Sequence, residues 1–424
     1  MQIVIVCDFG DVNGGAARVA VTSARGLAEA EIAVTFVCAI APLSPLLDHP
    51  RIAVRRLGID SVWKMTNPLA AAAQGIWNRR ARRALEAILD ELPRDGTVVH
   101  FHQWSKALSP SVLMAPLRRG LPAVVSLHDY FIACPNGAYY NYPKATPCRL
   151  TPMSAACIAA QCDSRSYAHK LIRVLRQWAT RWAVALAGAS LSILSVSPFA
   201  QQVVDRFLPR QHARFVVRSP IEDARMPAVP VAGNTDFVFV GRLTEEKGVR
   251  LLAEVARDAD LPLTIVGDGP LLEKLKKIGG RVRCTGWLEA PAVAEVLQRA
   301  RALIFPSTWY ETGGLVVLEA LARGIPVIAS RITAPIDFIA DGVNGFVIEP
   351  GDRETMLDRM RKLADDSVAG RMGDEAYRRY WTDPQSIEAH TGNLMSVYRA
   401  VLSGRKAGAA NPVAAAATLT ESVQ

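Results

Sequence analysis

The chain has 424 residues, enough for two or three domains that each bury their own core. Half of its residues are hydrophobic and 21% are charged, a balance typical of a globular α/β protein and unlike that of a disordered chain. The net charge of +9 is compatible with an anionic partner such as a nucleotide or a membrane surface, although a solvated basic surface is the simpler explanation. No apolar run reaches the roughly 18 residues that a membrane span needs. The first residues read as a strand without a basic leader, so we expect a cytoplasmic protein with reduced cysteines.

The first half of the chain alternates apolar strands with helical segments. A strand over residues 1–8 leads through Gly14-Gly15 into a helix, which is how a doubly wound domain opens, although the G-x-G-x-x-G fingerprint is missing. Further strands are predicted at 32–40, 51–59, 97–104 and 122–130, and a helix at 61–92. Strand C-termini line the ligand crevice of such sheets, so His102 and His128 point toward a site. A purely structural histidine is the alternative for each.

Residues 134–162 interrupt this alternation with a segment rich in Pro, Asn and Tyr. It contains four cysteines, Cys134, Cys148, Cys157 and Cys162. Four thiols in one irregular segment suggest a structural metal cluster, but no pair has the C-x2-C spacing of common zinc sites. Reduced cysteines that only pack, and a disulfide, therefore stay open beside the cluster.

A Pro-rich linker separates the two halves of the chain. The first half ends with a basic helix at 166–182 and strands at 189–199 and 214–222, and the linker follows at 223–235. A second series of strands and helices then begins, and it ends with an amphipathic helix at 384–402. The Ala-rich residues 403–424 are expected to be disordered.

The stretch from Ile304 to Arg323 carries the strongest chemical signal. A buried strand ends at Phe305, and Gly313-Gly314 then opens a helix whose first N–H groups have no internal partners. Free amides beside residues without Cβ atoms suit a diphosphate. Glu311 and Glu319 flank this anion site and suit sugar hydroxyls, unless they are incidental acids on a buried helix.

Two cations follow the first strand of the second half. Gly241 ends that strand, and Arg242 and Lys247 lie in the next loop, where they can clamp a diphosphate from the side opposite the helix amides. Gly267 marks a tight turn after the next strand. Trp287 follows the third strand, where the edge of a nucleotide base could lie. The alternative is that Arg242 and Lys247 are two ordinary surface cations.

Together these segments resemble the family 4 glycosyltransferases, which are retaining enzymes of the two-domain GT-B fold. The resemblance is strongest between Phe237 and Asp352, in the segments FVGRLTEEKG, TIVGDGP, CTGWL, GIPVIAS and DGVNGFVIEPGD and in the Glu311–Glu319 pair. It extends more weakly through NGGAARVA and His128-Asp129 over most of residues 1–402. The family implies an α/β fold of two doubly wound, Rossmann-like domains that face each other across a cleft. The implied division is an acceptor-binding domain at 1–222 with the insertion 134–162, a nucleotide-sugar domain at 223–385, and a helix at 386–402 that packs back toward the first domain.

The resemblance also implies a role for each matching residue. Arg242 and Lys247 would hold the donor diphosphate, Glu319 the ribose hydroxyls and Glu311 the donor sugar. His128 would contact the sugar near the reacting carbon. Backbone amides and close approaches would come from Gly15, Gly241, Gly267, Gly313, Gly314 and Leu315, and a base contact from Trp287.

One position departs from the family pattern. Relatives commonly carry phenylalanine or cysteine where this chain has Gly313, so the donor sugar is not fixed by the motif. The implied reaction is a front-face transfer with retention, in which the leaving diphosphate helps to deprotonate the acceptor hydroxyl. It needs no catalytic metal and no cofactor besides the donor, a UDP- or GDP-linked sugar.

The N-terminal half of the chain bears on the acceptor. The half that binds the acceptor in this family contains Trp63, Trp77, the basic run 79–83 and the helix 166–182. Such basic faces with tryptophan suggest a glycan or lipid-linked acceptor reached by peripheral contact with an anionic membrane at its cytoplasmic face. The size of the chain and its Cys-rich insertion suggest a role in surface polysaccharide synthesis. A solvated basic face is the alternative.

Two other functions compete with the glycosyltransferase. A GT-B relative that acts on sugar phosphates or epimerises a nucleotide sugar is the second function, and a non-catalytic basic scaffold or nucleic-acid-binding protein is the third. The paired acids and the cation clamp argue against both, and no nucleic-acid partner is expected.

Overall fold

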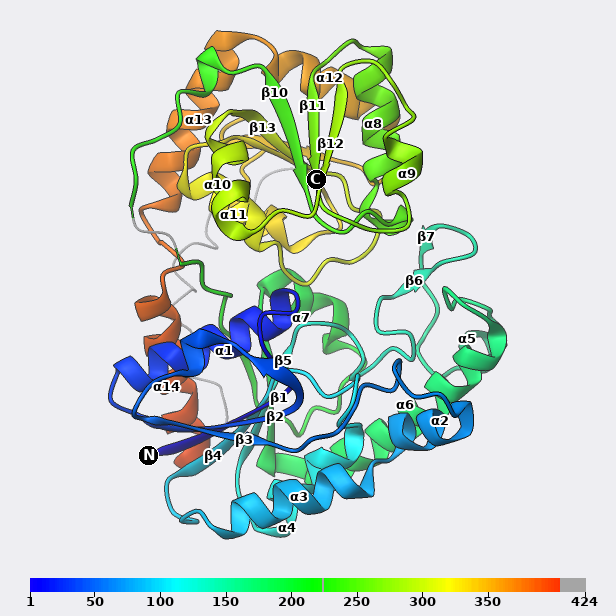
Figure 1. Cartoon of the computed structure of the whole chain (residues 1–424), viewed down its shortest axis with the longest axis vertical. Helices are drawn as coiled ribbons and strands as arrows, with labels where there is room; N and C mark the ends of the chain where they lie inside the picture. Colours follow the sequence, from blue (N-terminus) through cyan, green and yellow to red (C-terminus); the bar gives the residue numbers. More distant parts are fainter. Residues whose placement is uncertain (223–224, 405–424) are drawn as a thin grey trace.

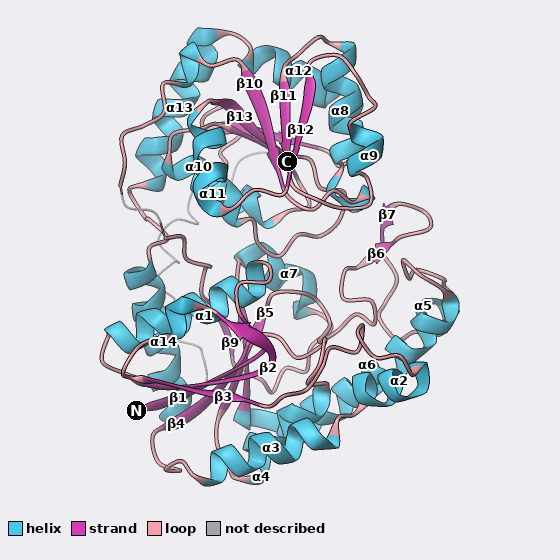
Figure 2. Ribbon diagram, viewed as in Figure 1, coloured by secondary structure: helices cyan, strands magenta, loops and turns pink. Residues whose placement is uncertain are grey.

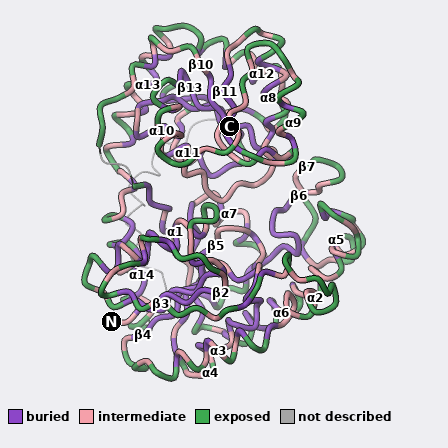
Figure 3. Tube along the Cα trace, in the orientation of Figure 1, coloured by how far each residue is buried: buried purple, intermediate pink, exposed green. Residues whose placement is uncertain are grey.

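The structure is a computed structural model that describes residues 1–222 and 225–404. It consists of two α/β domains, one above the other in Figure 1, and each has a parallel sheet between layers of helices (Figure 2). The central strands of both sheets are buried, whereas the edge strands and the outward faces of the helices are more exposed (Figure 3). The expectation of an α/β protein with two doubly wound domains is confirmed.

The N-terminal sheet has the strand order β3-β2-β1-β4-β5-β8-β9, and all of its neighbours pair in parallel. This order runs outward in both directions from β1, so the strand sequence reverses between β1 and β4, where doubly wound domains bind ligands. Its strands are β1 (Gln2–Gly10), β2 (Ala33–Leu43), β3 (Ile52–Arg56), β4 (Thr97–Phe101), β5 (Ala123–Leu127), β8 (Leu191–Ser195) and β9 (Arg214–Val216).

Helices cover both faces of this sheet. They are α1 (Gly15–Glu29), α2 (Pro68–Ile76), α3 (Arg79–Asp90), α4 (Met114–Arg118), α5 (Ala155–Ala159), α6 (Tyr167–Ala187) and α7 (Pro198–Asp205). The prediction of one helix over 61–92 is wrong, because the chain breaks at Trp77-Asn78 and forms α2 and α3. The Asn78 side chain accepts a hydrogen bond from the amide of Ala81 and so starts a new helix.

The insertion 134–162 contains α5 and a small antiparallel hairpin of β6 (Tyr140–Asn141) and β7 (Thr146–Pro147). All seven cysteines of the chain are free thiols, so the structure contains no disulfide in the insertion. Among residues 1–222 and 225–404 no three His, Cys, Asp or Glu side chains are placed to hold a metal ion. The metal cluster is therefore not found. The buried Lys170 ammonium instead lies 3.1 Å from the sulfur of Cys162 and 3.7 Å from that of Cys157.

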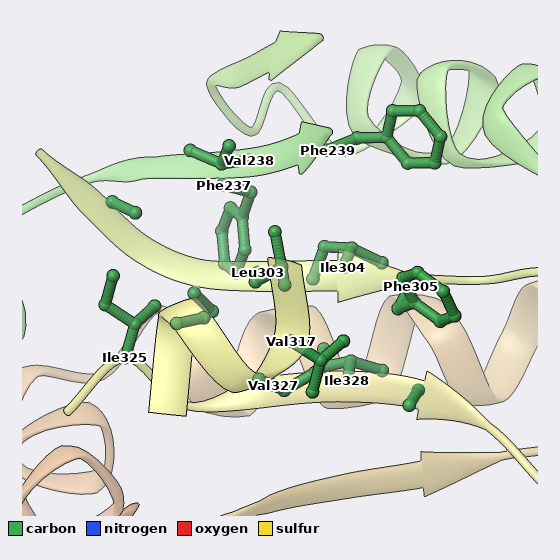
Figure 4. Packing of buried hydrophobic residues seen from close by; sticks show 14 of the residues in the cluster. Phe237, Val238, Phe239, Leu303, Ile304, Phe305, Val317, Ile325, Val327 and Ile328 are labelled. Atoms are coloured by element: carbon green, nitrogen blue, oxygen red, sulfur yellow. The ribbon is translucent and has the colours of Figure 1, made fainter. Parts of the chain in front are cut away.

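The C-terminal sheet repeats the same winding, in the order β12-β11-β10-β13-β14-β15, again with every pair parallel. Its strands are β10 (Asp236–Val240), β11 (Leu263–Val266), β12 (Val282–Gly286), β13 (Ala300–Phe305), β14 (Val327–Ser330) and β15 (Gly345–Ile348). Its helices are α8 (Val249–Asp258), α9 (Leu272–Leu275), α10 (Ala290–Gln298), α11 (Leu315–Ala322), α12 (Arg353–Leu363) and α13 (Asp366–Tyr380). Figure 4 shows β10, β13 and β14 packing their apolar side chains against α11, with Phe237, Leu303 and Val317 between them.

Short 3-10 turns complete the described chain. They are Pro45–Leu47, Pro110–Leu113, Gly188–Ser190, Val231–Gly233, Glu245–Lys247 and Ala334–Phe338.

The chain crosses between the domains twice, and the two crossings lie together. The amide of Ile221 donates to the carbonyl of Gln385 at 2.9 Å. The last helix, α14 (Ile387–Leu402), then packs on α1 of the N-terminal domain. A Cβ atom at Gly26 would lie 2.4 Å from the Thr391 hydroxyl, so this close approach requires glycine. The tail expected to be disordered falls, from residue 405 onward, outside the described residues.

Candidate functional site

The candidate site begins where the C-terminal sheet reverses its strand order, between the carboxyl ends of β10 and β13. The loop after β10 contains Gly241 and Arg242 and ends in the short turn Glu245–Lys247. Gly248 follows with a φ of 70°, and a Cβ atom there would lie 2.2 Å from the carbonyl oxygen of Pro306. Only glycine fits this position. The loops after β10 and β13 are thereby held against each other, and Lys247 lies beside the loop that carries Glu311.

Lys247 and Glu311 form a partly buried ion pair. The Lys247 Nζ lies 2.7 and 2.8 Å from the two carboxylate oxygens of Glu311, and the two side chains are only 12% and 14% exposed. The indole N–H of Trp309 donates to the same carboxylate, and its ring centroid lies 5.2 Å from Nζ. The structure therefore brings together a cation expected at the diphosphate and an acid expected at the sugar, each satisfied by the other.

The glycine pair precedes α11 as the sequence predicts. The amides of Leu315 and Val316 make no hydrogen bond within the described residues, while the amide of Val317 bonds to the carbonyl of Gly314. A Cβ atom at Gly314 would lie 2.7 Å from Pro335, whereas one at Gly313 would meet nothing within 4 Å. Two free amides at the start of an eight-residue helix are the kind of group that can bind an anion.

A small pocket at this glycine pair is lined from both domains. The N-terminal half contributes Val196, Ser197, Arg218 and Ser219, and the C-terminal half contributes Gly313, Gly314, Leu315, Val317, Leu318, Ala334, Pro335 and Phe338. The start of α11 therefore lies at the interface between the two domains.

Glu319, one turn into α11, is held by a residue that the sequence analysis missed. The Arg18 Nη1 lies 2.8 Å from a Glu319 carboxylate oxygen, and the side chains are 27% and 16% exposed. Arg18 lies in the first turn of α1, three positions after Gly15, which is exposed. The glycines of the segment GGAAR predict a tight turn, but nothing in the segment indicates that Arg18 has a partner 301 positions away.

His128 lies after β5 and faces this site from the N-terminal domain. Its Nε2 is 3.0 Å from the Nδ1 of His102, and its backbone carbonyl accepts a 2.8 Å hydrogen bond from the Thr312 hydroxyl. Burial, with a smaller contribution from His390, lowers the pKa of His128 to about 3, so the imidazole is neutral near pH 7. Burial also raises the pKa of the adjacent Asp129 to about 6.

The structure places the remaining predicted residues, Arg242, Gly267 and Trp287, at different distances from the ion pair of Lys247 and Glu311. Arg242 is exposed and makes no ion pair with any residue that the structure describes. Gly267 supports the site indirectly, because a Cβ atom there would lie 1.9 Å from the carbonyl oxygen of Gly241. Trp287 lies beyond β12 at the sheet edge, two strands from β10. It is 69% exposed, and its indole donates to Glu289. In the structure, Trp287 therefore does not lie with the Lys247–Glu311 pair.

Two family models match consecutive parts of the chain. The model described as Glycosyltransferase Family 4 matches residues 13–220, and the one described as Glycosyl transferases group 1 matches residues 222–379. Their common boundary coincides with the crossing at Ile221.

Named relatives and solved structures agree with these matches. A glycogen synthase of Mycobacterium tuberculosis is 26% identical over 330 residues, which cover 72% of this chain and 77% of that protein. A GDP-mannose-dependent alpha-mannosyltransferase of Corynebacterium glutamicum is 37% identical over 130 residues, covering 30% of this chain and 31% of that protein. The structure of Anabaena HepE in complex with UDP-glucose superposes with a TM-score of 0.63 at 16% identity, covering 94% of this chain and all of that one. With its fold, its two matched halves and these relatives, the chain belongs to the family 4 glycosyltransferases of GT-B fold, which act on nucleotide sugars.

Proposed function

We propose that the chain transfers a hexose from a nucleotide-diphosphate sugar to a hydroxyl of a glycan or lipid-linked acceptor, with retention of configuration at the transferred carbon. The observation that carries the proposal is the grouping of Lys247, Glu311 and Glu319 around the free amides at the start of α11. Cations and amides suit a diphosphate, and carboxylates suit hydroxyl groups. An enzyme acting on a sugar phosphate, or a protein without catalytic activity, would not need a diphosphate site and paired carboxylates together.

The donor is proposed to lie with its diphosphate on the amides of Leu315 and Val316. Lys247 and Arg242 would then offset the charge that develops on the leaving group. Lys247 is bound to Glu311 in the structure, so donor binding would exchange part of that ion pair for contacts to phosphate and sugar. Glu319 would take the ribose hydroxyls, for which it would have to share or release Arg18.

Retention is proposed through a front-face transfer. The leaving diphosphate would accept the proton of the acceptor hydroxyl, so no covalent nucleophile, metal ion or further cofactor is needed. A neutral His128 suits a position beside the sugar, because an uncharged imidazole accepts or donates a hydrogen bond without repelling developing positive charge at the reacting carbon. The two domains would exclude water from the donor, which would otherwise be hydrolysed.

A role in surface polysaccharide assembly at the cytoplasmic side of a membrane is part of the proposal. The seven free thiols suit a reducing compartment. The donor nucleotide is proposed to be UDP or GDP, because the relatives and structures named above include a GDP-mannose enzyme and a complex with UDP-glucose.

The test is the thermal stability of the purified chain with UDP, GDP, ADP, CMP and their common sugars. A ligand that binds only the folded state raises its unfolding temperature. We expect stabilisation by one diphosphate nucleotide and its sugars, and not by CMP. Transfer with that sugar to a simple acceptor, followed by NMR of the product anomer, then tests retention. Inversion would refute the front-face mechanism, and no stabilisation by any nucleotide would refute the donor site.

A further inference from the structure

Helix α6 exposes a continuous apolar stripe along its whole length. Its exposed large apolar side chains follow one another at spacings of four, four, three, four and four residues, which places them on one face. They are 38–64% exposed, and they are Tyr167, Leu171, Leu175, Trp178, Trp182 and Leu186. The opposite face of α6 is buried against the domain through Val174, Ala183 and Val184 among others. Nothing in the described chain covers the stripe.

Helix α2 lies beside α6 (Figure 1) and also leaves apolar side chains uncovered. None of its nine residues is buried, and Leu69 is 82% exposed. Trp77, just after α2, packs edge-on against Trp182 at 5.4 Å, and Arg165 lies 4.0 Å above the ring of Trp63, which is 44% exposed. We call this combined face the α2–α6 surface. It consists of Trp63, Leu69, Tyr167, Leu171, Leu175, Trp178, Trp182 and Leu186.

The same segments carry only positive charge. Residues 61–85 and 164–204 contain no Asp or Glu. Their exposed cations are Lys64, Arg79, Arg80, Arg83, Arg165 and Arg181. Apolar side chains with tryptophan among them, flanked by arginine and free of acids, are the composition of helices that lie in the headgroup region of an anionic bilayer.

Two other occupants fit the charges less well. A second copy of the chain would bring this basic face against an equally basic one. A protein partner would have to supply a long acidic apolar groove. A bilayer satisfies both features at once, because tryptophans prefer its interface and long basic side chains reach its phosphates. None of the helices within residues 1–222 and 225–404 is long and apolar enough to span a membrane, so α6 would lie along the surface.

We propose that the chain docks on an anionic lipid bilayer through the α2–α6 surface. The buried face of α6 connects this surface to the candidate site, since Arg176 donates to the carbonyls of Ser105 and Pro135 and interacts electrostatically with Asp129, beside His128. The proposal does not depend on the identity of the donor, because the α2–α6 surface shares no residue with the donor site.

The test is flotation of the full chain with vesicles of phosphatidylcholine alone or with 30% phosphatidylglycerol, at low and high salt. We expect binding to the anionic vesicles that weakens as salt rises. The variant Leu175→Glu/Trp178→Glu should lower the bound-to-free ratio at least tenfold. The control Val343→Glu/Leu402→Glu adds the same charge at two side chains that are 40% and 38% exposed elsewhere, and it should bind like the wild type.

The unfolding temperature and its shift with nucleotide should be the same in both variants and the wild type, which separates a failure of docking from a failure of the donor site. The proposal is overturned if the wild type does not float with anionic vesicles at low salt, or if the stripe variant floats equally well. It is also overturned if sedimentation finds a wild-type dimer that the stripe variant dissociates while vesicles bind neither, because the stripe would then join two copies of the chain.

Discussion

At the scale of single residues, Lys247 shows what a motif can and cannot indicate. Its place in a loop after a strand predicts a cation at a diphosphate, and the structure places it at the reversal point of the sheet. The sequence gives no sign that the lysine is already paired with Glu311, because the two lie 64 positions apart. In the proposed donor complex, phosphate would therefore compete with Glu311 for Lys247, and the strength of the ion pair would affect affinity as well as rate.

Replacing Lys247 with alanine should lower kcat by about 10²–10³, because one charge that stabilises the leaving group is lost. The unfolding temperature should change little, since the partly buried Glu311 keeps the indole of Trp309 as a hydrogen-bond donor. Steady-state kinetics with the identified donor measures the effect. Arg250→Ala is the matched control, because it removes an exposed cation three positions away that pairs with Glu245. An unchanged kcat in the lysine variant would remove Lys247 from the mechanism.

Buried histidines should make the N-terminal domain sensitive to acid. Burial, with repulsion from neighbouring histidines, lowers the pKa of His100 to about 3, while its ring bonds to Tyr398 and Ser126 at 2.7 and 2.8 Å. The unfolded chain takes up this proton near pH 6.5 and the folded chain does not, so the stability that neutral His100 provides is lost as pH falls from about 6.5 toward 3. At pH 5 the loss is about 2 kcal/mol for this residue.

This loss can be isolated by comparing variants in urea unfolding at pH 7 and pH 5. The wild type should lose about 2 kcal/mol more than His100→Asn between the two pH values, whatever other groups contribute. Tyr398→Phe is the control, because it removes the hydrogen bond but keeps the histidine, and so should retain most of the wild-type pH dependence. Equal losses in the wild type and His100→Asn would show that His100 titrates normally in the folded chain.

At the scale of elements, the start of α11 was predictable from the sequence, and the break between α2 and α3 was not. The apolar periodicity after Gly313-Gly314 indicates the start and the buried face of α11, and the structure agrees. The break between α2 and α3 depends on a cap at Asn78, whose side chain is fixed by the carbonyl of Ala107 and whose amide bonds to Ser109. Local sequence does not reveal such a tertiary contact, so the segment reads as one helix.

The two glycines before α11 should respond differently to alanine. At Gly314 the added Cβ would lie 2.7 Å from Pro335 and push α11 away, so we expect a loss of about 1–3 kcal/mol and weaker nucleotide binding. At Gly313 the added Cβ meets nothing, so the unfolding temperature and nucleotide binding should stay close to those of the wild type. Thermal unfolding with and without nucleotide measures both variants. Equal destabilisation would mean that the loop is displaced in solution.

At the scale of the whole molecule, the sequence predicts two domains but not how they hold each other. Three of the hydrogen bonds between the domains meet on the loop that carries Glu311. The Thr312 hydroxyl donates to the carbonyl of His128, and the Thr312 backbone carbonyl accepts from the hydroxyl of Ser197. The Thr308 hydroxyl bonds to that of Tyr140 in the insertion. Each partner lies more than 100 positions away, and threonine and serine are common in loops, so no pattern marks them. The cleft contacts are therefore the part of the site that required the structure.

Thr312 gives the sharpest test of whether this contact serves the reaction. Its hydroxyl joins the loop that carries Glu311 to the backbone of His128, the residue expected beside the reacting carbon. Thr312→Val keeps the shape but loses one hydrogen bond, worth about 1 kcal/mol, so kcat should fall about fivefold to tenfold. Nucleotide affinity should not change, because the diphosphate and ribose contacts proposed above lie within the C-terminal domain. Thr312→Ser retains the hydroxyl and should keep most of the activity. If valine leaves kcat unchanged, or serine is as damaging as valine, the hydrogen bond between Thr312 and His128 does not align the domains for transfer.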